Sequence, residues 1–137
     1  MDLKVSVAIL GMAALAGTSV TAHHAFSAEF DVNQPVRLTG TVTKIEMVNP
    51  HGWIHIDVKG ADGKVTTWKI ETGAPNSLAR RGITKNFLPI GQTVIVTGYR
   101  AKDMSSTAAG DHVKFPDGRD FAVGGSSEQG FPVKKQH

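Results

Sequence analysis

The sequence predicts a mainly β domain, namely a small five-stranded Greek-key barrel of the OB type with one short helix between its third and fourth strands. Three observations support this prediction. Apolar and polar residues alternate within short segments, turn-forming residues separate these segments, and the first predicted strand is long and bulged. A β-sandwich is the alternative fold, but the sequence contains about five strand signals where such a sandwich needs roughly seven.

The first strand is expected over residues 36–48. Even-numbered residues from 36 to 42 are apolar or glycine and alternate with polar ones, which is typical of a strand with one buried face. Ile45 then falls on the opposite parity. One extra residue at Thr43 or Lys44 would return the apolar side chains to the same face, so the sequence predicts a β-bulge there.

Two further strands are expected, each reached through a tight turn. Residues 49–52, with Asn first, Pro second and Gly fourth, match the preferences of a type I turn. The second strand, residues 53–60, has an apolar face and a mixed face, which consist of Ile54, Ile56 and Val58 and of Trp53, His55 and Asp57. After a Gly-Ala-Asp-Gly turn, the third strand places Trp68 and Ile70 on one face and Lys69 and Glu71 on the solvent side.

The second half of the domain is expected to hold a helix, a strand and a hairpin. The helix begins at Pro75, which suits a first helical turn, and ends at Gly82, which tolerates a left-handed conformation. Residues 92–101 are dense in β-branched side chains and form the fourth strand. Residues 104–111 are expected to be a loose connection, and residues 112–123 a hairpin with a Pro-Asp-Gly tip.

The start of the chain predicts export. Residues 5–22 are uncharged, have an apolar centre and follow Lys4, which is typical of a secretory signal peptide cleaved after Ala22. An uncleaved membrane anchor is less favoured, since the apolar centre falls short of the ~20 residues that a spanning helix needs. The mature protein is therefore expected to be periplasmic or secreted, without a stable membrane anchor. The predicted divisions are a signal peptide at 1–22, an N-terminal lead-in at 23–34, the barrel domain at 35–123 and a flexible tail at 124–137.

Composition excludes several classes of function. The chain contains no cysteine, so it has no disulfide, thiolate metal site or catalytic thiol. It carries 15 Lys and Arg against 12 Asp and Glu, which is too even a balance to argue for nucleic acid, and an exported protein seldom meets nucleic acid. The basic residues Arg80, Arg81, Lys85, Arg100 and Lys102 are accordingly expected to be solvated surface. No sequence motif of a known catalytic site is present, and no protein partner is indicated.

The predicted cleavage site indicates a metal centre at the new amino terminus. Cleavage after Ala22 would bring a free α-amine next to the imidazole of His23, and His24 could add another nitrogen. Such donors suit copper(II) best among the first-row divalent ions, and the arrangement resembles the histidine brace of exported copper proteins. His51 or His112 could complete the site. His51 and His55 cannot share one ion, because four residues along a strand span about 13 Å.

The mixed face of the second strand is a candidate ligand-binding surface. Trp53, His55 and Asp57 are expected to lie together there, and OB barrels bind ligands on the face of their second and third strands. An exposed Trp is an efficient stacking platform. The alternative is that the lead-in covers Trp53, since its Phe26 and Phe30 also need burial.

Four segments, HHAFSAEFD, VNPHGWIHIDV, LARRGI and VTGYRAKD, resemble a family of small exported bacterial proteins known as domain of unknown function 6152. The resemblance spans roughly His23 to Val123 and implies a compartment but no activity. The predicted barrel also resembles the broader class of bacterial exported OB-fold proteins, which implies ligand binding without catalysis.

The sequence therefore predicts an exported, non-enzymatic binding module that holds copper or another transition metal through His23, with His24 and His51 as further ligands. The alternative is an OB module that binds a small organic ligand or a protein through the face of Trp53, His55 and Asp57. A copper redox enzyme is a third possibility.

Overall fold

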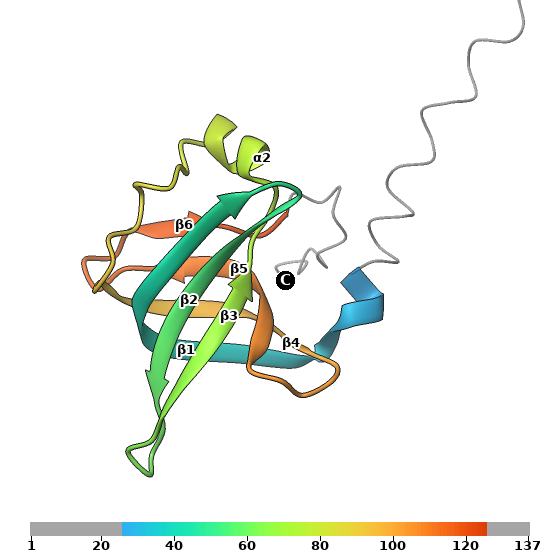
Figure 1. Ribbon diagram of the computed structural model, residues 1–137, viewed down its shortest axis with the longest axis vertical. Helices are drawn as coiled ribbons and strands as arrows, with labels where there is room; N and C mark the ends of the chain where they lie inside the picture. Colours follow the sequence, from blue (N-terminus) through green and yellow to red (C-terminus); the bar gives the residue numbers. More distant parts are fainter. Residues whose placement is uncertain (1–25, 126–137) are drawn as a thin grey trace, which may run out of the picture.

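One β-sheet organises residues 26–125, the part of the chain that the computed structural model describes (Figure 1). The strands are β1 (Phe30–Val48), β2 (His51–Lys59), β3 (Val65–Glu71), β4 (Thr93–Ala101), β5 (Thr107–Lys114) and β6 (Asp120–Ala122), and the helix α2 (Pro75–Arg80) lies between β3 and β4. Residues 26–29 form one more helical turn ahead of β1. The predicted mainly β class and the helix between the third and fourth strands are confirmed. The described part of the chain has six strands rather than the five expected.

The long strand β1 connects the two halves of the sheet. Its second half pairs with β2, its first half pairs with β4, and both pairings are antiparallel. The strand order is β3-β2-β1-β4-β5-β6, and an additional parallel pairing joins residues 69–71 of β3 to residues 107–109 of β5. Figure 1 shows β1 bending between its two halves, so that its end rises beside β2. The sheet therefore curves until β3 meets β5.

The bulge predicted in the first strand is present. Val42 pairs with Ile56, whereas Lys44 pairs with His55, so Thr43 is the extra residue on β1. The insertion shifts the side-chain alternation by one position. As a result, Ile45 packs against the same core as Val42.

The predicted inner faces of β2 and β3 form the centre of the hydrophobic core. Ile54, Ile56 and Ile70 are fully buried, and Trp68 is buried beside them. The other fully or nearly fully buried members of this cluster are Val42, Leu88, Val94, Val96, Ala108, Val113, Phe115 and Val123. The core thus takes side chains from both halves of the sheet and from the connection between α2 and β4.

A second, smaller apolar cluster lies on the outside of β4 and β5. Phe26 and Phe30 pack against Tyr99, with ring centroids 5.6 Å apart for the two Phe and 6.1 Å apart for Phe26 and Tyr99. Ala101 and Ala109 complete this outer cluster. The helical turn at residues 26–29 is therefore anchored to the outer surface of the sheet.

Two predictions about the first hairpin are wrong. The strand β1 begins at Phe30, within the predicted lead-in, because Phe30 pairs with Ala101 of β4 before the register shifts at Pro35. The turn does not have Pro at its second position. Val48 pairs with His51, so Asn49 and Pro50 are the two loop residues, and the peptide bond between them is cis.

The predicted loose connection over residues 104–111 is also wrong in its second half. β5 begins at Thr107, and Ala108 and Ala109 are completely buried. Small residues are required here because β5 lies very close to the backbone of β4 and to the side chain of Ile70 on β3. A Cβ atom on Gly110 would lie 2.6 Å from Cγ2 of Ile70, a contact that only glycine avoids. Local composition resembles a loop, but close packing makes this segment a strand.

Candidate functional site

The outer surface of β1, β2 and β3 carries the predicted ligand-binding residues. Trp53, His55 and Asp57 alternate along β2 with the buried Gly52, Ile54 and Ile56, so they share the outer face as predicted. Residues from the neighbouring strands surround them, namely Glu46 on β1 and Thr67, Lys69 and Glu71 on β3. We call this set of seven residues the Trp53 face.

The side chains of the Trp53 face interact with one another in pairs. Lys69 Nζ lies 4.6 Å from the centroid of the Trp53 ring, a distance at which a cation is attracted by the π-system. The Thr67 hydroxyl donates a hydrogen bond of 2.7 Å to Asp57 Oδ1. Asp57 is therefore already paired, and the half-buried indole is the main apolar surface that this face offers.

His55 is held by a carboxylate on the neighbouring strand. Its Nε2 lies 2.7 Å from Glu46 Oε2, and Lys44 Nζ lies 2.8 Å from Glu46 Oε1. Hydrogen bonds from Lys44 and then from His55 lower the pKa of Glu46 to about 2. Because this pKa is lower than in the unfolded chain, the contribution of Glu46 to stability is present above about pH 4.5 and is lost as the pH falls toward 2.

We expect replacement of either partner to raise the pKa of Glu46 toward 4.5, its ordinary value. Lys44→Met should raise it further than His55→Ala, because the hydrogen bond from Lys44 has the larger effect. NMR titration of the Glu46 side-chain carbonyl carbon measures both shifts. An unchanged pKa in both variants would contradict the paired arrangement.

His51 binds a different carboxylate, at the end of β3. It is the first residue of β2, and its Nδ1 lies 3.0 Å from Glu71 Oε1. The Glu71 side chain was expected to face solvent, but only 14% of it is exposed. Burial raises the pKa of Glu71, the charge of His51 opposes this effect, and the charge of Glu29 adds to it. The helical turn at residues 26–29 therefore lies within electrostatic range of the His51–Glu71 pair.

His112 was expected to be solvated at the start of a strand. Its side chain is 45% exposed, but the residue lies within β5 rather than at its start, and its Nδ1 is 2.8 Å from Asp120 Oδ1 on β6. The hairpin register causes this pairing. His112 is opposite Ala122, and Asp120, two residues before Ala122, lies on the same face and diagonally across from His112. His51, His55 and His112 are therefore each paired with a different carboxylate and do not converge.

The remaining metal-ligand candidates, His23 and His24, lie outside the described residues, as do the predicted signal peptide and residues 126–137 of the predicted tail. Within residues 26–125, no group of three or more His, Asp or Glu side chains is placed to hold a metal ion. A metal site that used His51 would thus need donors from elsewhere in the chain.

The predicted basic surface is partly engaged in hydrogen bonds to backbone carbonyls. Arg81 donates to the carbonyl oxygens of Ala122 and Gly124 at 3.0 Å each. Arg100 donates to the carbonyl oxygens of Met104 and Ser105, and Lys102 Nζ donates to that of Ser27. These cations fix loops and strand ends.

Sequence reasoning missed the importance of Glu46 and Glu71. Glu46 could have been placed on the outer face from the bulge, since one extra residue moves it to the side of Trp53. The contact between His51 and Glu71 is diagonal across two strands, and only the register of β2 with β3 reveals it.

No helix within the described residues is long and apolar enough to cross a membrane. Comparison with curated proteins found no match, and comparison with solved structures found none either. A family match covers residues 11–110, from within the predicted signal peptide to the middle of β5. It spans most of the chain and agrees with the resemblance seen in the sequence. The chain belongs to the family of unknown function DUF6152.

Proposed function

We propose that this protein is an exported, non-enzymatic binding module that holds copper(II), or another transition metal, at its mature amino terminus. The proposed donors are the α-amine and imidazole of His23, the imidazole of His24 and the imidazole of His51. The barrel provides a rigid support on which these donors meet.

The proposed support is a Greek-key barrel of the OB type. Its basis is the pairing pattern: β1 pairs with both β2 and β4, and β3 pairs in parallel with β5. A closing parallel pair and a helix between the third and fourth strands suit a five-stranded OB barrel. In this interpretation β6 is an addition to the edge of β5.

One observation carries the metal proposal: the outer cluster that contains Phe26 adjoins Glu71, the partner of His51. Phe26 packs against Ala109 in the outer cluster, Ala109 pairs with Glu71, and Glu71 is 3.0 Å from His51. Three peptide steps separate Phe26 from His23 and span at most about 11 Å. We propose that this reach brings the terminal amine to His51 after cleavage at Ala22.

The chemistry of this neighbourhood suits a cationic metal. His51 contributes an imidazole nitrogen, and the mostly buried Glu71 carboxylate lies beside it. A carboxylate that bonds to a metal-bound imidazole orients the ring and increases its basicity. Because Nδ1 of His51 faces Glu71, Nε2 is the nitrogen left for the metal.

Copper(II) titration of the mature protein, by competition with a chelator, tests this proposal. His51→Asn should weaken copper binding by at least roughly 10-fold. Loss of a residue that only hydrogen-bonds to a metal ligand already costs that much, and His51 is itself a proposed ligand. The matched control, His112→Asn, should not weaken it. A Met retained ahead of His23 should also weaken it strongly, because the terminal amine is then an amide. Equal affinity in the cleaved and extended proteins would refute the terminal site.

The second candidate function is binding of a small organic ligand or a protein on the Trp53 face. It is favoured by the partial exposure of the Trp53 ring on the outer face of β2. If this candidate is correct, Trp53→Ala should abolish binding of the ligand and leave copper affinity unchanged.

A further inference from the structure

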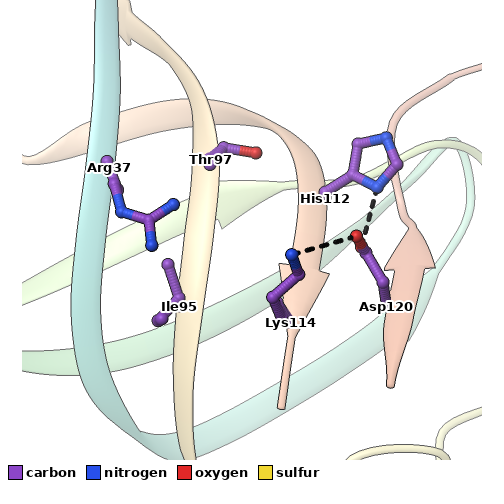
Figure 2. Close-up of a pocket in the computed structure, with 6 residues that line it drawn as sticks. All are labelled: Arg37, Ile95, Thr97, His112, Lys114 and Asp120. Carbon is purple, nitrogen blue, oxygen red and sulfur yellow. Dashed lines mark hydrogen bonds and ion pairs between the residues drawn. The ribbon is translucent and has the colours of Figure 1, made fainter. Parts of the chain in front are cut away.

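A hollow on the outer surface of β1, β4, β5 and β6 is separate from both the His51–Glu71 pair and the Trp53 face. Its volume is about 180 Å³, and it is lined by Arg37, Ile95, Thr97, His112, Lys114 and Asp120. Figure 2 shows these side chains reaching across one face from four strands. The strand register explains the convergence. Arg37, Thr97 and His112 form one row, and Ile95 and Lys114 lie in the next.

The hollow has an excess of positive charge. Arg37 and Lys114 are cations, and Asp120 is the single carboxylate in the lining. Asp120 is shared between His112, at 2.8 Å, and Lys114, at 3.8 Å. Arg37 makes no hydrogen bond or ion pair with any residue in the described range, so its guanidinium donors are free to bind an incoming group.

The free N–H donors of Arg37 are suited to bind an anion through its oxygen atoms. A guanidinium presents parallel N–H groups that fit the two oxygens of a carboxylate or phosphate. The Lys114 ammonium adds a second positive charge, and the Thr97 hydroxyl adds a neutral donor on the same surface (Figure 2). Ile95 adds an apolar side chain to the lining.

The size of the hollow limits the ligand to a small molecule. Its volume equals that of about six water molecules and is below the roughly 300 Å³ of pockets that enclose drug-sized ligands. No Phe, Tyr or Trp side chain lines it, whereas binding of nucleotide bases relies on stacking with such large rings. A compact anion therefore fits better than a nucleotide or an oligonucleotide.

We propose that the hollow lined by Arg37, Lys114 and Asp120 is a binding site for a small oxyanion, held by the guanidinium of Arg37 and the ammonium of Lys114. Asp120 limits affinity, because its negative charge repels the anion and competes with it for Lys114. This site does not depend on copper, on cleavage of the signal peptide or on His51.

Two probes and four variants test the proposal by NMR titration of the full chain. Inorganic phosphate and succinate distinguish phosphate from carboxylate ligands. We expect the tighter-binding probe to shift the resonances of Arg37 and Lys114 and to bind at least about five-fold more weakly to Arg37→Gln and to Lys114→Gln. Asp120→Asn should bind it more tightly, since a competing negative charge is removed. Lys85→Gln, which removes an exposed cation outside the hollow, is the control and should bind it as the wild type does.

Three results would overturn the site. One is the absence of saturable binding of either probe. Another is an equal loss of affinity in Lys85→Gln and Arg37→Gln, which would indicate general charge attraction. The third is unchanged or weaker binding in Asp120→Asn, provided that thermal unfolding shows this variant to be folded. Failure of the copper proposal would leave all three comparisons unaffected.

Discussion

Gly98→Ala is expected to destabilise the protein by more than about 3 kcal/mol, which exceeds the usual range of about 1 to 3 kcal/mol for overpacked sites. A Cβ atom on Gly98 would lie 2.0 Å from the carbonyl oxygen of Ala109 and 3.0 Å from its carbonyl carbon. Both atoms belong to the backbone of β5, so no side-chain rotation relieves the clash. The two strands would have to separate where the β4–β5 register shifts, between Thr97 and Gly98.

Chemical denaturation of the variant measures this effect, and Gly60→Ala is the matched control. A Cβ atom on Gly60 would come closest to Oδ1 of the exposed Asp62 side chain, at 3.0 Å, and that side chain can move away; the backbone oxygen of Lys64, at 3.5 Å, is at an ordinary contact distance. The control should change the free energy of unfolding by less than about 1 kcal/mol. If Gly98→Ala is as stable as the control, β4 and β5 are not as close as described.

The same close approach explains why part of the fold could not be predicted from the sequence. Alternation along β1 and β2 predicts their buried faces, since each apolar residue is two positions from the next. Ala108, Ala109 and Gly110 carry no such signal. They are in a strand because β5 pairs with β3 on one side and with β4 on the other. These pairings are long-range, so the local sequence does not predict them.

In the candidate sites, too, local alternation predicts some features, whereas others depend on long-range strand pairing. The shared face of Trp53, His55 and Asp57 follows from parity alone and was predicted. The partners of the histidines depend on which strand lies beside which, and at what register. Asp120 was within reach of prediction, because a hairpin with its tip at residues 116–118 brings it opposite Lys114. Arg37 was not, since it meets that hairpin only through β4.

The two tryptophans should respond very differently to truncation. Trp68→Ala is expected to cost about 3 to 5 kcal/mol of the free energy of unfolding, the usual range for a Trp in a core. Trp68 is 9% exposed, packs within the main core, and has Arg100 Cζ 5.2 Å from its ring centroid. Ile56→Ala, at a completely buried position beside it, should cost about 2 to 5 kcal/mol.

Trp53→Ala should cost less than about half as much as Trp68→Ala, because its half-buried ring lies on the outer face and loses less apolar contact with the protein. Urea denaturation of both variants under the same conditions makes the comparison direct, and a common m-value would show that both lose stability without a change in the denatured state. Since the two indoles occupy opposite faces of neighbouring strands, their difference measures which face is the core. Equal losses of stability in the two variants would indicate that Trp53 is also a core residue. The Trp53 face would then not be open to a ligand. A small loss of stability in Trp53→Ala would show that folding depends little on this large aromatic side chain. This is what we expect of a side chain that serves ligand binding.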